Sequence, residues 1–113
     1  MAPRTWRDWL PRRVLVRGPS MAPTLADGDV ILAWMNAAVA PGEVVLARWE
    51  QRPHQLSVKR ADRRVATQWY LLGDNPDGST DSRTLGPGTV VGVARWRLWP
   101  KPGRLLSRRP GRR

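Results

Sequence analysis

The hydrophobic and polar residues of this chain form short runs separated by turn-forming residues. Asp27-Gly28 and Pro41-Gly42 are strong turn signals. No stretch keeps the 3.6-residue apolar period of a helix for more than about two turns. Short apolar runs divided by Gly and Pro predict β-strands, here at residues 14–17, 30–35, 43–49, 55–60, 64–72 and 89–99. The expected fold class is all-β, as a small coiled sheet or a partly closed barrel.

The length and the polar segments predict one domain with a basic segment at each end. A chain of 113 residues can form a single modest core. The domain is expected at residues 14–99, after a basic segment at 1–13 and before a basic tail at 100–113 that is expected to be disordered. Within the domain, Arg52-Pro53-His54 is expected to interrupt the strands, and residues 73–83 to form a long polar loop.

The net charge of +11 lies mainly at the two ends of the chain. Residues 1–13 carry a net +3, residues 100–113 carry +6, and the body between them carries only +2. A surface dedicated to nucleic acid needs basic residues on a folded face, so no specific nucleic-acid partner is expected. The basic ends can contact an anionic membrane weakly, bind RNA or an acidic partner, or simply be solvated.

The chain contains no Cys and a single His, His54. Disulfides, thiolate metal sites, Cys nucleophiles and Ser-His mechanisms are therefore excluded, and no metal or cofactor is expected. The sequence has no apolar run of about 18 residues, and residues 1–13 lack the apolar region of a secretory signal. The expected location is the cytoplasm, with the membrane periphery as the alternative.

Lysine is rare in this chain, with two Lys against eighteen Arg. An Arg side chain stays protonated in proteins, whereas a buried Lys amine can lose its proton. Lys59 lies on a predicted strand next to the apolar residues Leu56 and Val58, and Lys101 lies in the tail. Lys59 is therefore a candidate base.

Three segments carry the candidate chemistry: GPSMAPTL at residues 18–25, Lys59-Arg60, and GDNPDGSTDSR at residues 73–83. Together and in this order they resemble the type I signal peptidases (S26), a family of Ser-Lys proteases related to LexA-type self-cleaving repressors. The resemblance covers residues 14 to 100 and implies the small coiled β-sheet of that family. The short interval from Lys59 to Gly73 implies that the large inserted β-domain of many members is missing.

A Ser hydroxyl is a weak nucleophile until a base takes its proton, and a neutral Lys amine with a lowered pKa can be that base. The resemblance implies that Ser20 is the nucleophile and Lys59 the general base. Ser20 follows Gly18-Pro19, so its own N–H can point at a developing oxyanion. The oxyanion hole is expected from Ser20 and Gly18.

The resemblance also implies residues that support the pair. Ser79 is expected to hydrogen-bond the Lys59 amine and orient it, although Ser82 offers a second hydroxyl nearby. The substrate is expected to bind as an extended strand beside the sheet. The other expected support is the pair Asp81 and Arg83, which Arg60 joins, then Asp74 and Asn75 at the turn that carries Ser79, and Met21 in the pocket for a substrate side chain.

The chain is small and its sequence shows no membrane anchor, and in this it resembles the maturation proteases of nickel-type superoxide dismutase. Residues 69–88 and 96–100 also resemble that subgroup. The implied function is a serine endopeptidase that removes an N-terminal leader from a precursor protein. The alternatives are general signal-peptidase-like processing at a membrane surface and a catalytically silent module that binds peptides.

Overall fold

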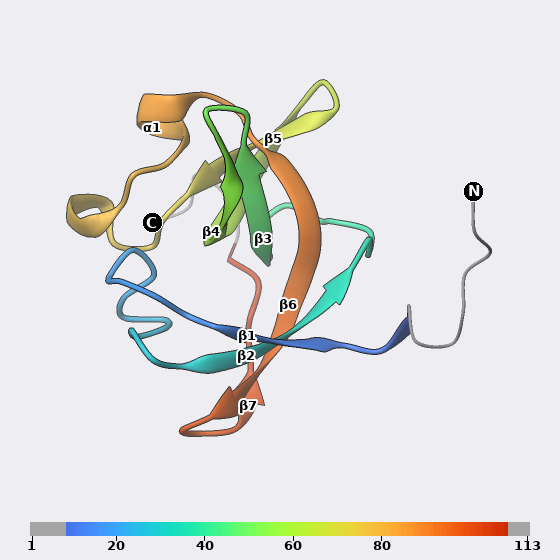
Figure 1. Cartoon of the computed structure of the whole chain (residues 1–113), viewed down its shortest axis with the longest axis vertical. Helices are drawn as coiled ribbons and strands as arrows, with labels where there is room; N and C mark the ends of the chain where they lie inside the picture. The colour runs from blue at the N-terminus through green and yellow to red at the C-terminus, as the bar shows by residue number, and fades with distance from the viewer. Residues whose placement is uncertain (1–8, 109–113) are drawn as a thin grey trace.

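The computed structural model describes residues 9–108, which form an open antiparallel β-sheet with very little helix (Figure 1). The strands are β1 (Arg12–Leu15), β2 (Val30–Met35), β3 (Val44–Trp49), β4 (Arg52–Val65), β5 (Gln68–Leu72), β6 (Thr89–Trp99) and β7 (Gly103–Arg104). Their order across the sheet is β1-β2-β6-β3-β4-β5, and β7 pairs with β6. The expected all-β class is confirmed.

Strand β6 joins the two halves of the sheet. It pairs with both β2 and β3, and Figure 1 shows it as a long curved strand that runs from one end of the sheet to the other. Successive residues of a strand point to opposite faces, so neighbours enter different clusters of buried side chains. Val45, Ala47 and Val93 lie in one cluster with Trp49, Ala61, Trp69 and Leu71; Val44, Leu46 and Ala94 lie in the other with Val16, Met21, Leu25, Ile31 and Ala33.

Strand β4 is longer than the sequence predicted. The segment Arg52-Pro53-His54, expected to interrupt the strands, lies inside β4, which returns from β3 after Glu50-Gln51. The register between β3 and β4 shifts between Ala47 and Trp49. Pro cannot donate to a sheet ladder and is tolerated at such irregular places, which explains how Pro53 fits into the strand.

The strand predicted at residues 64–72 is in fact the end of one strand, a turn and the start of the next. Strand β4 ends at Val65 and β5 begins at Gln68. Ala66, in the turn between them, has a φ of 55°. Tight hairpin turns need this left-handed backbone, which Gly and Asn usually supply. Because Ala66-Thr67 is not a typical turn sequence, the pattern of residues did not reveal the turn.

The polar loop between β5 and β6 contains a 3₁₀ helix, η2 (Pro76–Gly78), and a one-turn helix, α1 (Ser82–Leu85). The Asp81 carboxylate caps α1 by accepting a hydrogen bond from the Arg83 N–H. Trp69 and Gly88 exchange two backbone hydrogen bonds of 2.9 Å, which tie the beginning and end of this region together. None of the helices within residues 9–108 has the length and apolar character needed to cross a membrane.

Residues 100–108 are ordered rather than the disordered tail that their composition predicted. Strand β7 pairs with Trp96 and Arg97 of β6, and Leu105 packs against the core cluster that contains Val16. The Arg108 N–H then donates to the Gly42 carbonyl at 2.9 Å. Pairing and apolar burial fix this segment despite its Arg, Pro and Gly content. Residues 1–8 and 109–113 lie outside the described residues, so the predictions for these basic ends stay predictions.

We expect Leu105→Ala to lower the free energy of unfolding by about 1–2 kcal/mol, because a half-buried Leu loses apolar contacts and leaves a space behind. Leu106→Ala is the matched control, since the Leu106 side chain is 72% exposed and should matter by less than about 0.5 kcal/mol. Urea unfolding of the three proteins measures this. Equal stabilities of the two variants would contradict the packing of the C-terminal segment on the core.

Candidate active site

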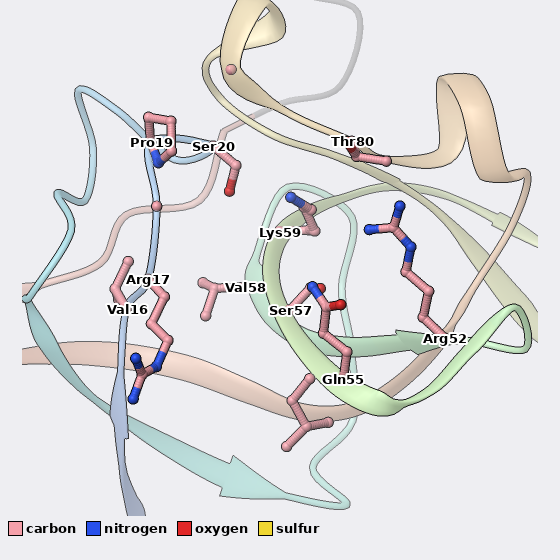
Figure 2. A pocket seen from close by; sticks show the side chains of 13 residues that line it. Val16, Arg17, Pro19, Ser20, Arg52, Gln55, Ser57, Val58, Lys59 and Thr80 are labelled. Carbon is pink, nitrogen blue, oxygen red and sulfur yellow. The ribbon is translucent and has the colours of Figure 1, made fainter.

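A cleft of about 380 Å³ lies between the segment that leads to Ser20 and one half of strand β4. Residues 16–20 form one wall, and residues 55–59 form the other. Gly78 and Thr80 of the polar loop border the same cleft. Figure 2 shows the Ser20 hydroxyl and the Lys59 amine pointing toward each other across it. The fold therefore brings together the two residues that the sequence singled out as nucleophile and base.

Lys59 is held in the sheet with its side chain buried. It lies on β4 opposite Val45 of β3, and only 5% of the residue is exposed. This burial is the largest influence on the Lys59 amine and lowers its pKa from 10.5, because it penalises the charged form. The negative charge of Asp81 acts in the opposite direction, and the cations of Arg52 and Arg83 lower the pKa further. The amine therefore loses its proton more readily than an ordinary Lys.

Two linked hydrogen bonds, through Ser79 to Asp81, hold the Lys59 amine in place. Lys59 Nζ donates to Ser79 Oγ at 3.3 Å, and Ser79 Oγ donates to Asp81 Oδ2 at 2.9 Å. Because the Ser79 proton is directed to Asp81, the hydroxyl accepts an N–H from Lys59 and leaves the lone pair of a neutral amine free to face elsewhere. Ser82, the other hydroxyl of this segment, is occupied differently: its Oγ accepts the Leu71 N–H at 2.7 Å.

Asp81 is the last acceptor in this series of hydrogen bonds and so anchors it, and the residue is almost completely buried. Burial alone would raise the pKa of its carboxyl group. Hydrogen bonds from the Arg83 side chain, the Gly73 N–H, Ser79 and the Arg83 N–H outweigh this effect and lower the pKa to about 2. The expected pairing of Asp81 with Arg83 is present, with 2.6 Å between Arg83 Nη2 and Asp81 Oδ2.

The segment Gly73-Asp74-Asn75 fixes the position of Ser20. The Asn75 N–H donates to the Ser20 carbonyl at 2.9 Å, and Asn75 Nδ2 donates to the Pro19 carbonyl at 3.0 Å. A Cβ atom at Gly73 would overlap Ser79 Oγ and would lie only 2.6 Å from the Ser20 carbonyl oxygen. Only glycine lets the two active-site segments approach this closely.

The Asp74 carboxylate binds side chains from two different segments, an arrangement that the sequence did not predict. Its carboxylate accepts hydrogen bonds from Arg60 Nε and Nη2 at 3.1 and 2.6 Å and from the Thr24 hydroxyl. Arg60 was expected to join Asp81 and Arg83. It binds Asp74 instead, and its Nη1 also donates to the Leu106 carbonyl at 2.8 Å. Thr24 lies four residues after Ser20, so the bonds to Asp74 connect the segment that follows Ser20 to β4.

Two predicted site residues do not have the surroundings that their expected roles need. Met21 is fully buried in the core cluster with Val16 and Leu25, and it is not among the residues that line the cleft. Gly18 does line the cleft, with a φ of 80°, but its N–H donates to Asp27 Oδ1 at 2.7 Å and is thus occupied. Among the described residues, the Ser20 N–H has no acceptor. It remains as the candidate oxyanion donor.

The arrangement supplies the parts that acyl transfer needs: a hydroxyl, a base with a lowered pKa and an available backbone N–H. Within residues 9–108, no hydrogen bond joins Ser20 Oγ to Lys59 Nζ. Such contacts are often long without substrate and tighten when it binds. In the same part of the chain, no group of three or more His, Cys, Asp or Glu side chains is placed to hold a metal ion.

Sequence reasoning missed Arg52 and Thr80 in the cleft and the contact that Thr24 makes with Asp74. Thr24 and Thr80 lie inside the recognised motifs, but nothing in the motifs shows which carboxylate or cavity a hydroxyl will face. Arg52 was placed in a turn. It reaches the cleft because β4 begins earlier than its residue pattern indicates.

Two comparisons place the chain among known proteins. The family described as "Peptidase S24-like" matches residues 13–94. "Mitochondrial ATP-independent inner membrane protease subunit 1a" of Arabidopsis thaliana is 34% identical over 75% of this chain and 68% of its own length. "Mitochondrial inner membrane protease subunit 1" of Homo sapiens is 28% identical over 77% of this chain and 69% of its own length, and the Mus musculus protein matches equally.

We expect Asp81→Asn to lower the free energy of unfolding by about 1–2 kcal/mol at pH 7, because it removes the buried charge that Arg83, Ser79 and Gly73 bind. The folded-state pKa of Asp81 is lowered, so its contribution is present above the ordinary value of 3.8 and is lost as the pH falls through about 2. Urea unfolding at neutral and at acidic pH should show the two proteins converging in acid.

The control is Asp62→Asn, which removes the exposed ion pair with Arg63 and should change stability by less than about 0.5 kcal/mol. If Asp81→Asn behaved like this control at neutral pH, Asp81 would not be the anchor of the site.

Proposed function

The chain belongs to the Peptidase S24-like family and is a serine peptidase of the signal-peptidase-like kind, and on this premise we propose that Ser20 is its nucleophile and Lys59 its general base. The observation that carries the proposal is the buried Lys59 amine, which Ser79 holds opposite Ser20 in one cleft. Burial lowers the pKa of this amine, as a Lys base requires.

In the first half of the reaction, the neutral Lys59 amine takes the proton of the Ser20 hydroxyl. Ser20 Oγ attacks the carbonyl carbon of the scissile peptide bond, and the carbonyl oxygen becomes an oxyanion that accepts the Ser20 N–H. The C–N bond then breaks, Lys59 gives its proton to the leaving amine, and an acyl-enzyme ester remains on Ser20.

In the second half, the same amine activates water. Lys59 takes a proton from a water molecule, which attacks the ester carbon. Ser20 Oγ leaves and recovers the proton from Lys59. Ser79 and Asp81 act as positioning residues in both halves, because they bind an N–H of Lys59 and keep its lone pair directed into the cleft.

The substrate we propose is a precursor polypeptide whose N-terminal leader is removed, and specifically the precursor of a nickel-type superoxide dismutase. The support is the resemblance of residues 69–88 and 96–100 to the maturation proteases of that enzyme. A second candidate is processing of secretory or membrane precursors at a membrane surface. The names of the similar inner membrane proteases favour this second candidate.

We expect Ser20→Ala and Lys59→Arg each to lower kcat/KM by at least about a thousandfold with the fold intact, since Arg cannot act as a base. Lys101→Arg is the matched control because it changes the only other Lys, which is exposed, and it should keep full activity. In the wild type, kcat/KM should rise with pH to a plateau, with a midpoint below 10.5. A Lys59→Arg variant with wild-type activity would end the proposed mechanism.

The two substrate candidates can be separated by incubating the protein with a nickel-type dismutase precursor and, in parallel, with a secretory precursor. We expect cleavage of the dismutase precursor alone, read as a new N-terminus by mass spectrometry, and no cleavage by Ser20→Ala. Cleavage of the secretory precursor alone would reject the dismutase assignment and leave the dyad untouched.

A further inference from the structure

Arg52 lines the cleft beside the proposed dyad and has no partner in the described part of the chain. Its side chain is exposed, and it forms no ion pair or hydrogen bond with any residue in the range 9–108. The arginines that support the site differ in this respect, because Arg60 binds Asp74 and Arg83 binds Asp81. Arg52 therefore has all of its donors available for a ligand.

The backbone at Arg52 is held firmly although its side chain is free. Arg52 pairs with Trp49 at the tip of the β3–β4 hairpin. Trp49 is buried and donates from Nε1 to the Gly86 carbonyl at 2.8 Å, and Gln51 Nε2 donates to the Leu85 carbonyl at 3.0 Å. Two anchors on the helix-α1 loop thus fix the tip of the hairpin, which lowers the entropy cost of binding at Arg52.

The cleft is positively charged. Besides the Lys59 amine, its lining contains Arg17 and Arg52, which stay protonated, and no Asp or Glu. Asp81 lies behind Lys59, where Arg83 and the Gly73 N–H already bind it. Figure 2 shows the Arg52 guanidinium on the Lys59 side of the cleft. A peptide in the cleft therefore meets an unpaired cation close to the reacting groups and no competing carboxylate.

We propose that Arg52 determines specificity by binding an acidic side chain of the substrate within about three residues of the scissile bond. This inference rests on the proposed function and names the class of peptide that the same cleft accepts. A planar guanidinium binds a carboxylate through two parallel hydrogen bonds, a geometry that an amide cannot match. Asp or Glu in the substrate would therefore be preferred over Asn or Gln.

Arg52 is also near enough to Lys59 for its charge to lower the pKa of the amine. A substrate carboxylate on Arg52 would cancel that effect. Because the pH dependence of kcat reports the pKa in the enzyme–substrate complex, a peptide with Glu at the recognised position should reach its kcat plateau at a higher pH than the matching Gln peptide. A merely structural Arg would not produce this difference between two substrates.

The test is cleavage of a synthetic library of random decapeptides, with cleavage sites read by mass spectrometry. In the wild type, Asp and Glu should be enriched over Asn and Gln about fivefold at one position within three residues of the cut. Arg52→Gln should remove the enrichment at that position while still cleaving. Arg48→Gln is the matched control, because Arg48 is an exposed β3 residue outside the cleft, and it should keep the enrichment.

A binding experiment separates this inference from the proposed function. Immobilised Ser20→Ala protein should retain acidic peptides of the same library over their amides, and Ser20→Ala/Arg52→Gln should not. Cleavage without acidic enrichment, or enrichment that survives in Arg52→Gln, would overturn the role of Arg52 and leave the dyad standing. Selective retention with no cleavage by the wild type would overturn the dyad and support Arg52.

Discussion

The burial of a single amine is the constraint on which the rest of this site depends. An ammonium group is costly to remove from water, and a direct carboxylate partner would stabilise its charged form. The fold places Ser79 between Lys59 and Asp81, so the amine contacts a neutral hydroxyl while the charge of Asp81 is bound by Arg83 and the Gly73 N–H. Because the folded-state pKa of Lys59 is lowered, the fold loses stability as the pH falls from 10.5 through that pKa. The burial that lets Lys59 act as a base therefore also lowers the free energy of unfolding at neutral pH.

The polar loop offsets that cost by joining segments that lie far apart in the sequence. Asn75 holds the carbonyls of Pro19 and Ser20, and Gly73 lets Ser79 approach them closely. Asp74 binds Arg60 of β4 and Thr24, which lies four residues after Ser20. In the ordered C-terminal segment, the Leu106 carbonyl accepts a further hydrogen bond from Arg60. The residues that stabilise the fold around the cleft are thus also the ones that set the geometry of the nucleophile and its base.

The sequence predicted the all-β class and the segments that meet at the site, because strand patterns and motif residues are local signals. It could not predict which residues pair across the fold. Arg60 binds Asp74 rather than Asp81, the Gly18 N–H is occupied by Asp27, and Met21 packs in the core. The turn at Ala66-Thr67 lies in a tight hairpin without a typical turn sequence, and residues 103–108 are held by pairing with β6 and by the packing of Leu105, which composition does not encode. Arg52 was missed because β4 begins earlier than its residue pattern indicates.

The most direct test of the central claim is an NMR titration of the Lys59 amine. The chain has two Lys, so Lys101→Arg leaves Lys59 as the only lysine side chain to observe. We expect its signal to titrate with a midpoint below 10.5, and the midpoint to move upward in Arg52→Gln, because the cation of Arg52 helps to lower the pKa. A Lys59 midpoint at or above 10.5 would mean that burial does not favour the neutral amine, and Lys59 could not then be the base of this site.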